Sequence, residues 1–162
     1  MMTKMFLLAA ALLLAVPTLS QAQERAPTAP KLFASAAEVD AAIAKARAEH
    51  KGGNTVEILA NTGIYTWQLE YRTTTTPPSV HKQQAELIYV AGGGCTLIMG
   101  GKLVNPKDNG ANLAGTAVEG GTPRKVAKGD YILVPAGTPH WYTDPQGEFI
   151  SIALHMPQEP GR

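Results

Sequence analysis

Three residues have the types and positions needed to bind a divalent metal. His81 and Glu86 lie five positions apart, and His140 follows a Pro-x-Gly turn much later in the chain. Residues five apart on a regular strand point to opposite faces, so a turn or bulge at residues 83–85 must bring His81 and Glu86 to one interior. Two imidazoles and one carboxylate on a common side form the facial triad that holds ions such as non-haem iron. A surface histidine and a rim carboxylate are the alternative interpretation of His81 and Glu86.

Short strands are expected to position these residues. Residues 65–72 alternate polar and apolar side chains, which is typical of a strand with one buried face. Further apolar runs, each with glycine or proline nearby, lie at residues 87–90, 96–99, 131–134 and 149–154. Residues 107–121 are expected to form a polar, glycine-rich connection. About six short strands separated by turns predict an all-β sandwich or barrel.

One α-helix is expected ahead of the strands. Ser35 and Glu38 have the spacing of a capping box, and Gly52 and Gly53 follow as a stop signal. The alanine-rich segment between them has a thin apolar stripe, which predicts a helix packed on the outside of another element. His50 lies in its last turn, where an imidazolium suits the helix dipole, and is not expected to be a ligand.

The N-terminus has the order of a secretory signal peptide. Lys4 precedes twelve apolar residues, 5–16, and Ser20-Gln21-Ala22 is a small-x-small cleavage site. Twelve residues are too few to span a bilayer core, which needs about 20. We therefore expect residues 1–22 to be removed and the protein to be periplasmic or secreted, without a membrane partner after cleavage.

The composition predicts one domain and limits the kinds of partner. Residues 23–34 are expected to form a flexible leader, and residues 35–160 a single domain. The 162 residues carry 14 basic and 13 acidic side chains, a net charge of +1. No basic stripe points to nucleic acid, so a small-molecule ligand is the expected partner. A hydrophobic fraction of 44% excludes a disordered chain.

The single cysteine, Cys95, excludes a disulfide framework and a multi-cysteine metal site. Gly94 and Thr96 flank it within a strand-like stretch. A buried structural thiol is therefore expected, with a nucleophile or an intermolecular disulfide as alternatives.

Two segments around the candidate ligands resemble the motifs of the cupin superfamily. The first motif has the form G-x5-H-x-H-x3–4-E-x6-G, and the spacing from His81 through Glu86 to Gly93 matches its second half. The second has the form G-x5-P-x-G-x2-H-x3-N, and the matching residues are Gly129, Pro135, Gly137 and His140. The resemblance implies a double-stranded β-helix, a jelly-roll barrel, here with one N-terminal α-helix. It also implies a metal held by His81, Glu86 and His140.

The chain departs from the family pattern at three positions. Ser79 stands in place of the first histidine, the leading glycine is absent, and Asp144 stands in place of the final asparagine. Since a serine hydroxyl is a poor ligand for borderline metals, a three-ligand site is favoured, as in catalytic centres that keep an open position. Gln83 could offer an amide oxygen. His155, near the end of the last strand, is a pocket residue only if its strand face points inward.

These features favour an exported metal-binding cupin that acts on an unidentified small molecule by oxygenase-, isomerase- or lyase-type chemistry. The ion would be iron, manganese, zinc or nickel. The alternative is a non-enzymatic cupin, with or without a metal, that binds or senses a small ligand. Tyr89 and Tyr142 are the candidate acids or bases apart from the metal ligands. Arg124 either meets an anionic substrate or is a solvated strand charge. A homodimer is expected, with residues 54–72 contributing.

Overall fold

The structure, a computed structural model, describes residues 30–158. The predicted signal peptide, residues 1–22, and the first part of the predicted leader lie outside the described residues. Within 30–158, no helix is long and apolar enough to cross a membrane.

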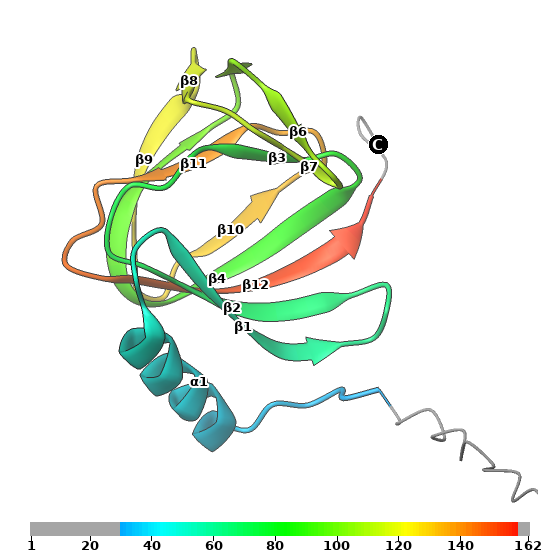
Figure 1. The fold of residues 1–162 in the computed structure, drawn as a ribbon, viewed down its shortest axis with the longest axis vertical. Coiled ribbons are helices and arrows are strands. Elements are labelled where there is room, and N and C mark those ends of the chain that lie inside the picture. The colour runs from blue at the N-terminus through cyan, green and yellow to red at the C-terminus, as the bar shows by residue number, and fades with distance from the viewer. Residues whose placement is uncertain (1–29, 159–162) are drawn as a thin grey trace, which may run out of the picture.

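The described chain starts with one helix and continues in strands (Figure 1). The helix is α1 (Ala36–Glu49). The strands are β1 (Asn54–Asn61), β2 (Thr66–Arg72), β3 (Ser79–His81), β4 (Gln84–Met99), β5 (Lys102–Val104), β6 (Lys107–Asn109), β7 (Asn112–Ala114), β8 (Ala117–Glu119), β9 (Thr122–Ala127), β10 (Tyr131–Val134), β11 (His140–Thr143) and β12 (Phe149–Pro157).

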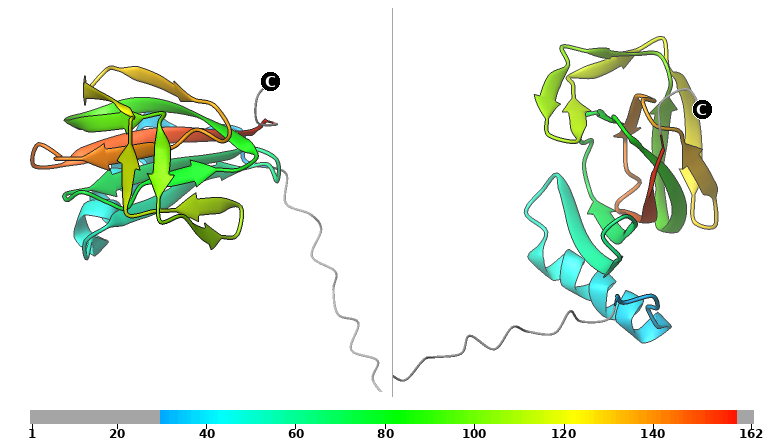
Figure 2. Two further views of the ribbon diagram at one scale, coloured as in Figure 1. Left: turned by 90° about the horizontal axis from the view of Figure 1, so that it is seen from above. Right: turned by 90° about the vertical axis from the view of Figure 1, so that its right-hand side faces the viewer.

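The strands curl into a barrel of two facing sheets that share β4 (Figures 1 and 2). One sheet has the order β1-β2-β12-β4, with β10 on the other side of β4. The other sheet has β9 and β11 on either side of the second half of β4, followed by β3, β7 and β6. Strands β5 and β8 pair as a separate ribbon. All pairs are antiparallel, and the expected all-β jelly roll with one N-terminal helix is confirmed.

The sequence predicted two strands at residues 87–90 and 96–99, but the structure has one strand, β4, that spans both. Its first half pairs with β12 and its second half with β9, so it must bend between them. The bend lies at Gly93, whose φ is +66° and where a Cβ atom would overlap the carbonyl oxygen of Glu148. Only glycine fits this conformation and this close approach. The glycines that resembled a turn therefore allow one strand to join both sheets.

Helix α1 covers the outer face of the sheet at β1 and β2. The expected capping box is present, with Ser35 and Glu38 bonding each other's backbone N–H groups. Beneath the helix, Ala46 packs with Leu69 and Tyr71. This cover explains why β2 is not the half-buried strand that its alternation predicted, because its last four residues are buried on both faces.

The predicted connection at residues 107–121 contains the short strands β6, β7 and β8. Strands β6 and β7 are three residues long and have no buried face, so their sequences show no alternation. Backbone pairing with neighbouring strands holds them in place. Strand β7 pairs with β3, which places it along the barrel mouth beside His81.

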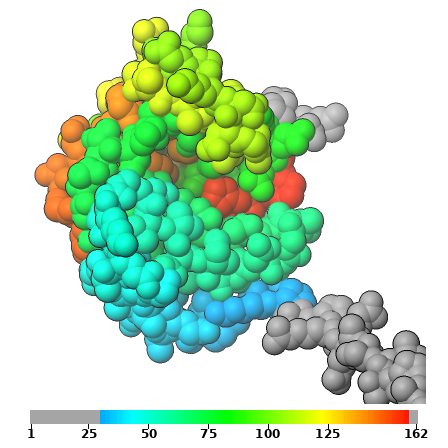
Figure 3. Space-filling model, in the orientation of Figure 1, coloured from blue at the N-terminus to red at the C-terminus, as the bar shows by residue number. Residues whose placement is uncertain are grey.

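The interior of the barrel divides into an apolar part and a polar part. The apolar part packs side chains from both sheets, among them Ile88, Leu97, Ile132 and Phe149. The polar part is a cavity that opens between β2 and the segment β6–β7, where the space-filling view is hollow (Figure 3). The fold thus leaves one end of its interior available for a ligand.

The bend of β4 predicts unequal costs for two glycine substitutions. Gly100→Ala meets no atom within 4 Å but must adopt a φ of +81°, so it should lower the free energy of unfolding by about 1–2 kcal/mol. Gly93→Ala adds an overlap with backbone to the same strain, so its loss should exceed about 4 kcal/mol or prevent folding. Urea unfolding of both variants measures the difference. Equal losses would contradict a role for Gly93 in closing the barrel.

Candidate metal centre

The polar end of the barrel contains a cavity of about 520 Å³. Its walls come from β1, β2, β3, β4, β6, β7, β11 and β12, so both sheets contribute. The polar lining residues are Asn54, Thr66, Gln68, Glu70, Arg72, Thr76, Ser79, His81, Gln84, Glu86, Asn109, Asn112, His140, Tyr142 and His155. Such a lining suits a small polar molecule better than an apolar one.

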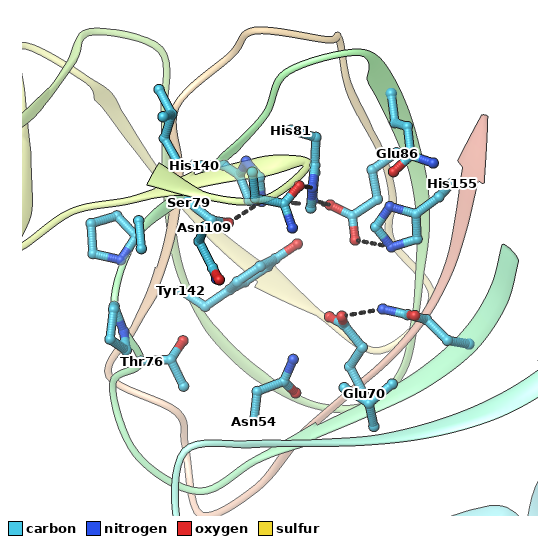
Figure 4. Close-up of a pocket in the computed structure, with 18 of the residues that line it drawn as sticks. Asn54, Glu70, Thr76, Ser79, His81, Glu86, Asn109, His140, Tyr142 and His155 are labelled. Carbon is cyan, nitrogen blue, oxygen red and sulfur yellow. Dashed lines mark hydrogen bonds and ion pairs between the residues drawn. The ribbon is translucent and has the colours of Figure 1, made fainter. Parts of the chain in front are cut away.

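The three residues predicted from the sequence as metal ligands meet at the wall of this cavity (Figure 4). His81 ends β3 and Glu86 lies near the start of β4. The bend expected at residues 83–85 lies at residues 82–83, because β4 already begins at Gln84. His140 is the first residue of β11, which pairs with Ser79 on β3. Nε2 of His81 lies 3.5 Å from Oε2 of Glu86, and Nε2 of His140 lies 3.6 Å from the same oxygen.

Both imidazoles are held with Nε2 toward Glu86. Nδ1 of His81 lies 2.8 Å from Oδ1 of Asn112, and Nδ1 of His140 lies 3.2 Å from the carbonyl oxygen of Thr138. Since both partners are acceptors, each Nδ1 carries a proton. Although burial opposes it, contact with the Glu86 carboxylate raises the pKa of His81, so a cation would displace a proton from its Nε2. Acceptors behind the ring are also what orients metal-binding histidines.

Glu86 is almost completely buried, with 1% exposure, yet it is ionised. Burial alone raises the pKa of its carboxyl, but contact with His81 and the charges of His140 and His155 together lower that pKa to about 2. Burial lowers the pKa of His140, which favours its neutral form. An ionised carboxylate beside a neutral imidazole is the state that binds a cation.

The donor set fits a divalent transition metal. Oε2 of Glu86 is buried without a hydrogen-bond partner, although an unpartnered buried polar atom is costly. Ligands about 2.1 Å from a tetrahedral metal are about 3.4 Å apart. The two nitrogen-to-oxygen distances, 3.5 and 3.6 Å, are close to this value. An ion bound by His81, Glu86 and His140 would satisfy the open oxygen.

A second charged group forms the opposite wall of the cavity. The two oxygens of Glu70 accept hydrogen bonds from Nε2 of Gln68 and Nη2 of Arg72, both at 2.7 Å. The guanidinium of Arg72 lies 4.4 Å above the ring of Tyr142. The Tyr142 hydroxyl is buried without a partner, and burial raises its pKa well above the usual value, so it remains a proton donor.

For four other candidate residues the sequence did not determine whether the side chain lines the cavity. His155 faces the cavity, and so does Tyr142. Tyr89 does not line this cavity and packs its ring against Tyr131 at 4.9 Å. Arg124 is exposed on β9 and does not line the cavity, so it is a solvated strand charge here.

Of the two further candidates, Gln83 lies outside the site and Ser79 lies within it. Gln83 is exposed and outside the cavity, so the expectation of an amide oxygen from it is wrong, and its neighbour Gln84 lines the cavity instead. Ser79 lies in the site, with its Oγ 3.1 Å from Nε2 of His140. The hydroxyl donates to that nitrogen, because Nδ1 of His140 carries the proton.

The sequence analysis missed Asn112, Glu70 and Arg72. Asn112 fell in the predicted connection, where no pattern marked a strand. A signal for the other two was present, because alternation along β2 places Gln68, Glu70 and Arg72 on one face. Three polar residues on the inward face of a barrel strand indicate a polar interior.

No family model matches the chain, and no curated protein matches it. Solved structures do resemble it. TT1209 from Thermus thermophilus has a TM-score of 0.52 and 12% identity, over 72% of this chain and 94% of that one. KdgF from Halomonas sp. has a TM-score of 0.49 and 18% identity, over 68% and 86%. The polyketide cyclase RemF from Streptomyces resistomycificus has a TM-score of 0.46 and 19% identity, over 68% and 72%.

Identities this low concern the fold and not the activity. The described part of the chain has the jelly-roll fold that the resemblance of its two motifs implied.

Cys95 is buried in the apolar part of the barrel, and burial raises the pKa of its thiol to about 12. Since the thiolate is the reactive form, Cys95 should not react with a disulfide reagent such as DTNB at pH 8 in the native protein. It should react fully in guanidinium chloride. The measurement is the absorbance of released thionitrobenzoate. Rapid release from the native protein would favour the alternative of a nucleophilic thiol.

Proposed function

We propose that this protein is an exported cupin that binds one divalent transition metal and acts on a small polar molecule in the cavity. The carrying observation is the buried, unpartnered Oε2 of Glu86 between the Nε2 atoms of His81 and His140. Iron, manganese, zinc and nickel all suit two imidazoles and a carboxylate.

The cavity supports oxygenase-, isomerase- or lyase-type chemistry. A metal there would supply Lewis acidity or an open position for a second ligand. Tyr142 offers a protonated hydroxyl toward His81 and Glu86 (Figure 4). Arg72, Glu70 and Gln68 present fixed hydrogen-bonding groups opposite, which would orient a substrate. Ser79 leaves more room beside His140 than the histidine of the family motif would.

A binding or sensing protein without catalysis is the second candidate. It is favoured by Ser79, which removes one ligand of the family pattern and ties up His140 by a hydrogen bond. Screening the metal-loaded protein against small polar metabolites, by thermal shift and then by product analysis, separates the two. Binding without turnover of any bound compound would support the second candidate.

The predicted ligands should differ in their effect on metal affinity. His81→Ala and His140→Ala each remove a nitrogen ligand and should weaken binding by more than about 100-fold. Glu86→Gln should also weaken it, because it removes the negative charge that offsets the dication. Competition with a chromophoric chelator measures each dissociation constant.

Ser79→Ala is the matched control for these variants. Its hydroxyl contacts His140 but is a poor ligand, so its removal should leave the affinity equal or slightly tighter. A large loss of affinity in Ser79→Ala, or none in His140→Ala, would contradict the assignment.

Removal of the metal should lower the melting temperature without unfolding the chain at room temperature. The apolar part of the barrel does not depend on the ion, unlike the core of a zinc finger. Ligand at a hundred- to thousand-fold excess over its dissociation constant adds about 3–4 kcal/mol to the native state. Circular dichroism with and without a chelator measures the shift, and no shift at all would favour a metal-free protein.

We also propose a homodimer that pairs through the outer face of β2, β12, β4 and β10. Trp67, Leu154, Leu87 and Leu133 form a cross-strand row there. Leu133 is 55% exposed. Contiguous exposed apolar rows are typical of interaction surfaces.

Export, which rests on residues 1–22, stays a prediction. The mass of the N-terminal segment of the mature protein tests it.

Leu133→Lys should therefore convert the dimer to a monomer at micromolar concentration in light scattering, because it places a charge in the apolar row. Leu32→Lys, at an exposed leucine outside the row, is the control and should remain dimeric. A monomeric wild-type protein would contradict the proposal.

A further inference from the structure

His155 is a buried imidazole that the cupin motifs do not include. It lies on β12 with its side chain 8% exposed, and neither ring nitrogen has a hydrogen-bond partner. Its Nε2 is 3.7 Å from Oε1 of Glu86, and its ring meets that of His81 edge to face at 4.8 Å between centroids. Figure 4 shows it on the other side of the Glu86 carboxylate from His140.

An imidazole in this position has two unsatisfied nitrogens, and each of them carries a desolvation cost. A neutral imidazole has one N–H and one lone pair, and neither is used by a protein partner here. His81 and His140 both have an acceptor behind the ring, while His155 has none. Its orientation toward Glu86 is therefore not explained by hydrogen bonding within the protein.

Two groups of possible ligand atoms share Glu86. The atoms of His81, Glu86 and His140 lie within 4.8 Å of one another, and so do those of Glu70, Glu86 and His155. Oε2 of Glu86 faces the first group and Oε1 faces His155. Both oxygens of Glu70 already accept hydrogen bonds, one of them from a guanidinium. A second dication beside Arg72 would meet its positive charge at close range. The site with Glu70 is thus disfavoured. His155 falls outside the 4.8 Å spread of the first group, so its ring would have to close toward an ion held there by Glu86.

We propose that His155 is the fourth protein ligand of the metal centre, which rests on the metal-binding function proposed above. Glu86 would contribute through both oxygens, with His81 and His140 on one side of its carboxylate and His155 on the other. The histidine that Ser79 replaces on β3 is thereby supplied from β12, the last strand of the barrel. The centre would keep three imidazoles and one carboxylate, and would leave the space beside Ser79 for a substrate.

The test uses Co²⁺ as the probe with the purified full-length mature protein. Stoichiometry and affinity come from competition with a chromophoric chelator. Proton NMR of the Co²⁺ form counts paramagnetically shifted imidazole N–H signals, one for each coordinating histidine. The wild type should bind one Co²⁺ per chain and show three such signals. His155→Ala should show two and bind more than about 100-fold more weakly, beyond the effect of a residue that only orients a ligand.

Two further variants separate coordination from structural support. His50→Ala removes the remaining histidine, whose ring bonds Thr55 and Thr73 outside the cavity. It should change neither the Co²⁺ affinity nor the number of shifted N–H signals. The double variant Ser79→His/His155→Ala restores the family position and should recover at least about tenfold in affinity and the third signal. If His155→Ala fails to fold by circular dichroism, His155→Gln replaces it in the series, since the amide retains polarity and much of the volume.

The outcomes are distinct. Unchanged affinity and three remaining signals in His155→Ala would overturn the role of His155 while leaving the proposed function intact. Two Co²⁺ per wild-type chain, one of them lost in His155→Ala, would assign His155 to a separate site with Glu70 and overturn the single centre. No Co²⁺ binding by the wild type would overturn the proposed function itself, and this inference with it.

Discussion

A buried negative charge at Glu86 is the constraint on which the polar end of this barrel depends. A carboxylate with 1% exposure is stable only if positive charge or donors stand close to it. Histidines from β3, β11 and β12 place their Nε2 atoms 3.5–3.7 Å from it, so three strands must converge at this point. The convergence requires the closed jelly roll, and the bend of β4 at Gly93 is what allows that closure.

The cavity is polar as a direct result of this arrangement. Side chains next to a buried charge must be satisfied, and Gln68, Glu70 and Arg72 form their own paired row on the facing strand. That row is neutral within itself, because Glu70 and Arg72 form an ion pair, so it adds hydrogen-bonding groups without adding net charge. The facing wall therefore presents fixed donors and acceptors more than a net field.

The motifs and the helix signals were enough to predict the fold and to bring His81, Glu86 and His140 into one hypothesis. They succeed because Pro135 and Gly137 fix a turn locally, and the Ser35–Glu38 box fixes a helix start. The place of His155 could not be predicted, because both faces of β12 are largely apolar and buried, so alternation gives no inward side. The length of β4 was missed because a glycine bend within a strand has the same composition as a turn.

The order of the strands also determines when the barrel can form. β12, the last strand, lies between β2 and β4, so the first sheet has a gap until the C-terminal residues are available. The ion pair between Arg47 on α1 and Glu148, just before β12, joins positions 101 residues apart. Local pairing alone cannot produce the sheet, and closure is intrinsically slow for such distant contacts. A chain emerging from the ribosome therefore lacks its finished barrel until residues 149–157 have been synthesised, and β2 and the first half of β4 stand with unpaired edges during that time.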